Sequence, residues 1–143
     1  VYIGTEGGQS QVGSSKWEQY QIETLLVAIL AAVDSRPAGH HLGPPYLTAY
    51  QLAIELQRCH PDVARALGYP LGGEGIGQPN SLAQYLGQQL SRRIHTGEIT
   101  GIEGALFSDL HVAEVVFKYD GAKIKSTSAG YGFDHTMFRI SKK

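Results

Sequence analysis

The stretch SLAQYLGQQLSRRI, residues 81–94, decides the fold expected of this chain of 143 residues. Its apolar side chains recur at steps of three or four, which is the spacing of one face of an α-helix. They are Leu82, Tyr85, Leu86, Leu90 and Ile94. Ser81 suits the N-cap, and Gln84 stands three places on, as in a capping box. Thr96 and Gly97 provide a stop signal, so the pattern predicts a helix from Ser81 to Thr96.

Two further helices are predicted upstream. Residues 16–35 repeat apolar side chains at helical spacing after an N-cap at Ser15, and the run LLVAILAAV predicts a core helix enclosed on most sides. Thr48 and Gln51 have capping-box spacing at the start of the next helix, which Pro61 should end. A short helix over 62–67, closed by glycine, is expected to follow.

Downstream of Gly97 the pattern changes to that of strands. The run HVAEVVFKY, residues 111–119, is rich in β-branched and aromatic residues, and Asp120-Gly121 before AKIKSTS is a strong hairpin signal. Residues 133–140 alternate as a final strand, in which Phe138 is expected to pack into the core. The stretch EITGIEGALF, residues 98–107, is ambiguous between a strand and a loop.

The order of elements predicts an α+β fold, with a three-helix core followed by a C-terminal antiparallel β-hairpin or three-stranded sheet. Residues 1–15 are rich in Gly, Ser and Gln and predict a flexible N-terminal arm. Residues 16–143 then form a single domain, which matches the usual length of one domain.

Composition excludes several classes of protein. With 42% hydrophobic and 17% charged residues, the chain is neither a disordered tail nor a coiled coil. A lone cysteine, Cys59, excludes an internal disulfide and any zinc site that needs two cysteines. The longest apolar run, Leu25–Val33, is too short to span a bilayer. We expect a cytoplasmic protein without a membrane partner.

Three helices followed by a twisted hairpin resemble the element order of winged-helix domains, over residues 16 to 140. The resemblance also rests on the passage from YLTAYQLAIEL, residues 46–56, to SLAQYLGQQLSRRI. It implies that the first helix supports a helix-turn-helix made by the second and third, and that the hairpin is the wing. The chain departs from the usual turn of three or four residues, because residues 57–80 intervene.

The resemblance implies that DNA is the partner and that the third helix is the recognition helix. Glutamine and arginine forks match the edges of adenine and guanine. The residues expected on its outer side are Gln84, Gln88, Ser91, Arg92 and His95, with Gln89 and Arg93 flanking. Lys123, Lys125, Lys142 and Lys143 would contact phosphates. Charge supports this modestly, since residues 1–79 carry a balance of −3 and residues 80–143 one of +2.

A second interpretation stays open at this point. Glutamine and arginine fill any solvated helix face, and a pI near 6.6 lies below the value typical of nucleic-acid-binding domains. Winged helices also serve as protein-interaction modules, so a protein partner or a homodimer without DNA contact is the alternative.

No enzyme, cofactor or metal site is predicted. The stretch GGEGIGQPNS, residues 72–81, lacks the lysine and the spacing of a phosphate-binding P-loop and favours a surface loop. His40 and His41 should diverge, and no HxxxH or HxH pair occurs. The motif GxSxG is absent, and neighbouring Cys59 and His60 would point about 100° apart on a helix. Tyr131, between two glycines, is either an exposed residue that contacts a partner or a base, or a residue that covers the turn.

Overall fold

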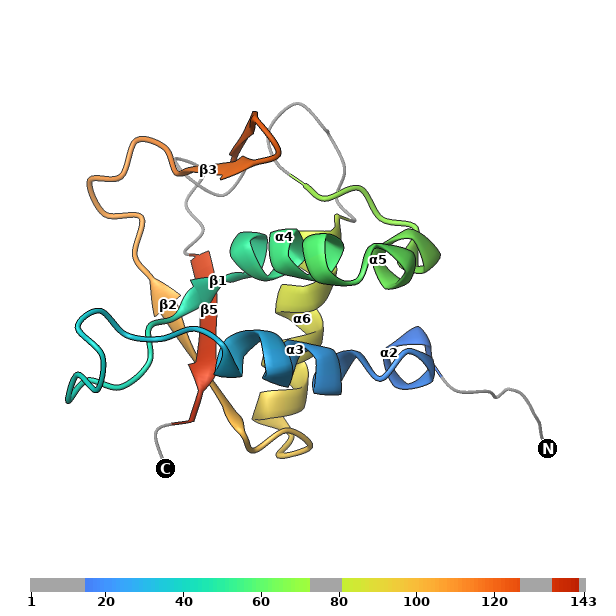
Figure 1. The fold of residues 1–143 in the computed structure, drawn as a ribbon, viewed down its shortest axis with the longest axis horizontal. Coiled ribbons are helices and arrows are strands. Elements are labelled where there is room, and N and C mark those ends of the chain that lie inside the picture. Colours follow the sequence, from blue (N-terminus) through green and yellow to red (C-terminus); the bar gives the residue numbers. More distant parts are fainter. Residues whose placement is uncertain (1–14, 73–80, 127–134, 142–143) are drawn as a thin grey trace.

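The structure of the chain is a computed structural model that describes residues 15–72, 81–126 and 135–141 (Figure 1). The helices in these ranges are α2 (Lys16–Gln19), α3 (Ile22–Ala31), α4 (Ala49–Cys59), α5 (Pro61–Leu67) and α6 (Leu82–His95). The strands are β1 (Leu47–Thr48), β2 (Ile102–Phe107), β3 (Val116–Tyr119), β4 (Ala122–Lys125) and β5 (His135–Ile140). The predicted α+β class is confirmed. The predicted arm up to residue 14, most of the glycine-rich loop, Tyr131, Lys142 and Lys143 lie outside the described residues.

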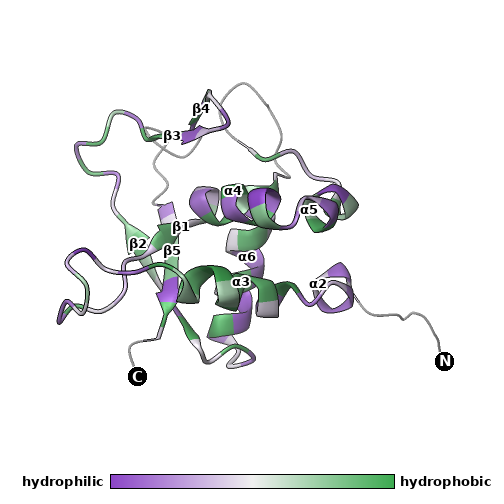
Figure 2. Ribbon diagram, in the orientation of Figure 1, coloured by the Kyte–Doolittle hydropathy of each residue, from purple (hydrophilic) through white to green (hydrophobic). Residues whose placement is uncertain are grey.

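Helices α3, α4 and α6 enclose the hydrophobic core, and α6 runs behind the other two in Figure 1. Each helix contributes a stripe of leucine or isoleucine to it. The fully buried members are Ile22, Leu26, Leu30, Leu52, Leu56, Leu82, Leu86 and Leu90. Burying one such side chain stabilises the fold by about 1.5–3 kcal/mol. Figure 2 shows that α3 is almost wholly hydrophobic, yet only one side of it is enclosed, because Ala28 and Ala31 are exposed.

The first predicted helix is interrupted. Ser15 caps α2 as expected, but Gln21 adopts a left-handed conformation with φ of 52°, and a second helix starts at Ile22. In one continuous helix Trp17 and Ile22 would point about 140° apart. The break turns both side chains into the core, where Trp17 is 3% exposed and Ile22 is fully buried. The second helix ends at Ala31, four residues before the predicted end.

The start of α4 is the predicted capping box. The backbone N–H of Gln51 donates to Thr48 Oγ1 at 3.2 Å, and the N–H of Thr48 donates to Gln51 Oε1 at 2.7 Å. The predicted cap of α6 is also present, with Ser81 Oγ accepting from the N–H of Gln84 at 3.1 Å. Pro61 starts α5 and Gly68 ends it in a left-handed conformation, as expected.

Thr48→Ala should lower the free energy of unfolding by about 1 kcal/mol, because one N–H at the start of α4 loses its acceptor. Thermal unfolding followed by circular dichroism measures the change. Thr48→Ser, which keeps the oxygen, is the matched control and should lose less than half as much. Equal losses in the two variants would show that the methyl group, and not the cap, carries the effect.

The last strand, β5, is the centre of a three-stranded antiparallel sheet in the order β1-β5-β2. Phe138 pairs with Leu47 on one side and with Gly104 on the other, and its ring is buried in the core. A Cβ at Gly104 would lie 3.3 Å from this ring, so glycine makes room for it. The ambiguous stretch of residues 98–107 therefore contains strand β2, and β1 was not predicted.

Strands β3 and β4 form the predicted hairpin, but as a separate two-stranded sheet. Asp120 and Gly121 form its turn, and both have the positive φ that a type I′ turn needs. The predicted strand over 111–119 begins only at Val116. Phe117 stacks on Tyr50 of α4 with ring centroids 5.5 Å apart, and this contact holds the hairpin against the helices.

Candidate nucleic-acid interface

The exposed face of α6 is polar. Its buried stripe of leucines points toward α4, so the opposite side of the helix is left to solvent. Five predicted interface residues are exposed on that side: Gln84, Gln88, Ser91, Arg92 and His95. None of them is acidic. The structure therefore brings together, on one side of one helix, the amide, hydroxyl, guanidinium and imidazole groups predicted from the sequence.

Arg93 does not lie on this face. The prediction placed it at the flank of the interface, but its side chain turns inward and is 8% exposed. Its guanidinium lies over the Trp17 ring, 4.8 Å from the centroid, and forms an ion pair with Glu98. Successive side chains of an α-helix point about 100° apart around its axis. Arg92 therefore points to solvent, whereas Arg93 points toward the core. Arg93 joins α6 to α2 and to the turn after α6.

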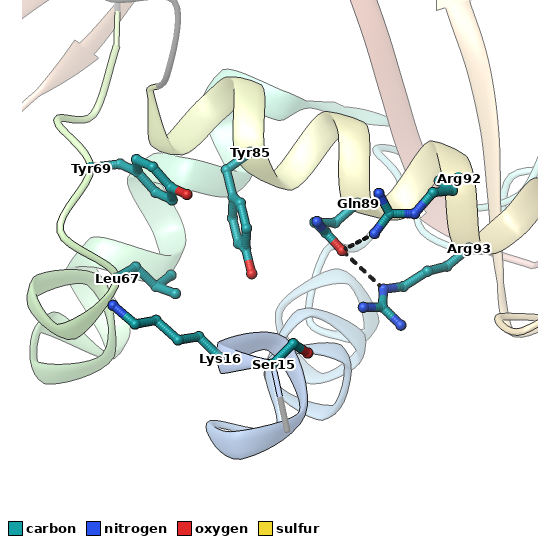
Figure 3. A pocket seen from close by; sticks show the side chains of 8 residues that line it. All are labelled: Ser15, Lys16, Leu67, Tyr69, Tyr85, Gln89, Arg92 and Arg93. Atoms are coloured by element: carbon teal, nitrogen blue, oxygen red, sulfur yellow. Dashed lines mark hydrogen bonds between the residues drawn. The ribbon is translucent and has the colours of Figure 1, made fainter. Parts of the chain in front are cut away.

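Gln89 positions both arginines. Its Oε1 accepts a hydrogen bond from Arg92 Nη2 at 2.9 Å and one from Arg93 Nε at 3.2 Å (Figure 3). Sequence reasoning had placed Gln89 only beside the face. Its spacing of three and four residues from the two arginines is the signal that identifies such contacts on a helix.

The hairpin carries a basic face. Lys118 of β3 stands directly opposite Lys123 of β4, and both are exposed. The two ammonium groups repel each other at these paired positions. Their combined positive potential attracts an anion. Lys125 lies on the same face but is neutralised by an ion pair with Glu114 at 3.2 Å. The prediction named Lys123 and Lys125 and missed Lys118, which the two-residue turn places opposite Lys123.

A buried hydrogen bond joins the end of the hairpin to the start of β5. Ser126 Oγ and His135 Nε2 are 2.6 Å apart, and the two residues are 1% and 3% exposed. We assign this buried pair a structural role. Its hydrogen bond connects the hairpin with the three-stranded sheet.

The other chemically active side chains are dispersed. Within the described ranges, no three histidine, cysteine or acidic side chains gather in a way that would hold a metal ion. His40 and His41 do not diverge as expected, because their loop lets the two rings stack 4.3 Å apart. Cys59 is an exposed residue at the end of α4. Of the helices in the described ranges, none has the length and apolar character needed to cross a membrane.

Comparison with known proteins gives no further guide to function. No family model, no curated protein and no solved structure matches this chain. The exposed face of α6 and the basic face of the hairpin are therefore the features that bear on function.

Proposed function

We propose that the chain is a DNA-binding domain of winged-helix type, which reads bases with α6 and contacts phosphates with the β3–β4 hairpin. The observation that carries the proposal is the exposed side of α6, where glutamine, serine, arginine and histidine side chains stand together without a carboxylate. A helix of this kind fits the major groove, where amide and guanidinium forks match adenine and guanine.

Two features of the fold support the proposal. Helices α3, α4 and α6 pack together and strands β2 to β5 follow them, as expected of a winged-helix domain, while the two-residue strand β1 lies between α3 and α4. The hairpin adds two exposed lysines, Lys118 and Lys123, at paired positions. Lysine side chains supply the phosphate contacts that fix the position of a protein on the duplex. The stretch between α4 and α6 contains α5 and remains longer than a usual helix-turn-helix turn.

Arg92→Ala should weaken specific DNA binding by about 1–3 kcal/mol, or roughly 5- to 150-fold, and relax the preference for guanine at one position. The duplex for the assay is first selected from a randomised pool with the intact chain, and affinity is then measured by fluorescence anisotropy at several salt concentrations. Thermal stability should change little, because Arg92 is exposed and its side chain hydrogen-bonds, within the described residues, only to Gln89.

Arg65→Ala is the matched control for this experiment. Arg65 is an exposed arginine of α5 that forms an ion pair with Asp62 of the same helix. The Arg65→Ala substitution removes the same charge as Arg92→Ala but lies outside α6. It should therefore change the affinity for the selected duplex by no more than about twofold, as is usual for a distant surface charge. Equal losses in the two variants, or no binding to any duplex at low salt, would reject the proposal.

A specific observation favours protein interaction as the second candidate. Leu106 and Leu110 are 65% and 71% exposed, at the end of β2 and just beyond it, and Phe107 is also exposed. β2 is an edge strand of its sheet, and edge strands can pair with an added strand. If DNA binding fails, light scattering of the intact chain against Leu106→Ser and Leu110→Ser variants tests self-association through this edge.

A further inference from the structure

A cavity of about 300 Å³ lies beside α6, between its exposed face and the core. It is bordered by the start of α2, the end of α5, the residue after Gly68 and one side of α6 (Figure 3). The eight lining residues are Ser15, Lys16, Leu67, Tyr69, Tyr85, Gln89, Arg92 and Arg93. This volume is near the lower end of the range for sites that hold small molecules.

The lining of this cavity is cationic. Three of the eight side chains are positively charged, and none is a carboxylate. Glu98 balances the charge of Arg93. Lys16 and Arg92 form no ion pair with any residue in the described part of the chain, and the same holds for Lys118 and Lys123 of the hairpin, whereas five other cations in those ranges are paired. Those paired cations are Arg58, Arg65, Arg93, Lys125 and Arg139. Two unbalanced positive charges therefore border one small cavity.

Lys16 is held at the rim by the protein itself. Its Nζ donates a hydrogen bond to the carbonyl oxygen of Ala66 in α5, at 3.1 Å. An ammonium has three donors, so this bond leaves donors for a ligand. In Figure 3 Lys16 approaches the cavity from α2, while Arg92 and Arg93 approach it from α6. Cationic donors on opposite sides of a cavity suit an anion with several acceptor oxygens.

The two tyrosines provide a ring surface and hydroxyl donors. Tyr69 and Tyr85 pack with ring centroids 5.1 Å apart, and Figure 3 shows the Tyr85 hydroxyl directed into the space between Lys16 and Arg93. No group in the described ranges accepts a hydrogen bond from either hydroxyl. Burial, and to a lesser degree Tyr69, raises the pKa of Tyr85, so its hydroxyl keeps its proton and remains a donor at neutral pH.

We propose that this cavity binds the phosphate group of a small phosphate monoester. Lys16, Arg92 and the Tyr85 hydroxyl hold the phosphate, and the organic part of the ligand packs against the tyrosine rings and Leu67. A phosphate monoester carries a charge of about −1.5 to −2 at pH 7, which matches the two unbalanced cations. The phosphodiester of a nucleic-acid backbone carries a single charge and is the other source of the same chemistry. The proposal does not depend on DNA binding, because two of its three donors lie outside the proposed DNA face.

Trp17 makes the site measurable in the intact chain. It is the one tryptophan of the sequence, and its ring lies 6.3 Å from that of Tyr85 and beneath Arg93. Ribose 5-phosphate, which does not absorb at tryptophan wavelengths, is the probe. We expect a saturable change in Trp17 emission with a dissociation constant below about 1 mM, and the same constant from titration calorimetry. Ribose alone should not bind.

Variants locate the binding. Lys16→Ala should weaken ribose 5-phosphate binding about tenfold or more, as expected for the loss of one charge-assisted hydrogen bond. Tyr85→Phe keeps the ring and should weaken binding about fivefold through loss of the hydroxyl alone. Arg58→Ala, an exposed arginine of α4 that does not line the cavity, is the control and should bind as the unaltered chain does. Circular dichroism checks that each variant is folded.

Three results would overturn the proposal. The first is no heat and no change in emission with ribose 5-phosphate. The second is binding that Lys16→Ala and Tyr85→Phe leave unchanged, which would place the ligand elsewhere. The third is equal affinity for dimethyl phosphate, a phosphodiester, which would assign the cavity to nucleic-acid backbones. If the unaltered chain binds no DNA in the anisotropy assay but does bind ribose 5-phosphate, the proposed function is rejected and the phosphate site stands.

Discussion

Replacing Lys118 and Lys123 together with glutamine is expected to weaken DNA binding about 60-fold at about 0.1 M salt. Each lysine that neutralises a phosphate releases bound counterions, which contributes a slope of about −0.9 to the dependence of log K on log salt concentration. The double variant should therefore flatten this slope by about 2. Anisotropy titrations over a series of salt concentrations measure both quantities in the same experiment.

The double variant should keep the fold, because the change removes a repulsion instead of a contact. The two ammonium groups stand at paired positions of β3 and β4 and are exposed. Like charges at such positions destabilise a hairpin by a few tenths of a kcal/mol, so thermal stability should stay level or rise slightly. A clear fall in stability would show that these lysines support the hairpin through their aliphatic stems.

The control carries the same change in net charge at a different place. Arg58→Gln with Arg65→Gln removes two exposed, ion-paired arginines of α4 and α5. This pair of changes should leave the salt slope within about 0.5 of the original, because neither residue belongs to the proposed contact surface. If both double variants flatten the salt slope equally, the affinity for DNA depends on the total charge of the protein, and the hairpin does not act as a wing.

Arg93→Ala is expected to lower the free energy of unfolding by roughly 1–3 kcal/mol, with a fall in melting temperature of about 5–10 °C. The change removes the stacking of the guanidinium on Trp17, the hydrogen bond to Gln89 and the ion pair with Glu98. Half of the Glu98 side chain is exposed, so water can solvate the carboxylate that remains, and the loss is smaller than for a fully buried pair.

Arg93→Lys separates the contributions to this loss. Lysine keeps the charge but lacks the planar fork that stacks on the indole while it reaches two acceptors, so it should recover less than half of the stability. Trp17 emission reports the change directly, since the guanidinium lies over its ring. A melting temperature of Arg93→Ala within about 1 °C of the unaltered chain would contradict the inward role given to this residue.

Local signals predicted the features that depend on neighbours in the sequence. The cap of α4 requires only Thr48 and Gln51, and the hairpin turn requires only Asp120 and Gly121. In each case the interacting groups lie within a few residues of one another, so the residue types determine the geometry. The buried stripe of α6 followed from spacing for the same reason, and with it the exposed face.

Features set by distant partners were not predicted. Glutamine has no preference for the left-handed conformation of Gln21, which exists because Trp17 and Ile22 both enter the core. Strand β1 has two residues and forms only against β5. Arg93 and Arg92 are the same residue type at adjacent positions, and what separates them is the placement of Trp17, about 75 residues earlier in the chain. No spacing rule carries that information.

The central position of β5 has a consequence for the order in which the protein assembles during synthesis. The helices interact early, because α3 to α6 follow one another along the chain. β1 and β2 have no strand in common until residues 135–140 have left the ribosome, and Leu47 then pairs with Phe138 across about 90 residues. Closing so long a loop is slow compared with helix packing. We therefore expect the helices to pack before β5 is synthesised. Until then, the part of their surface that faces the sheet stays exposed to solvent.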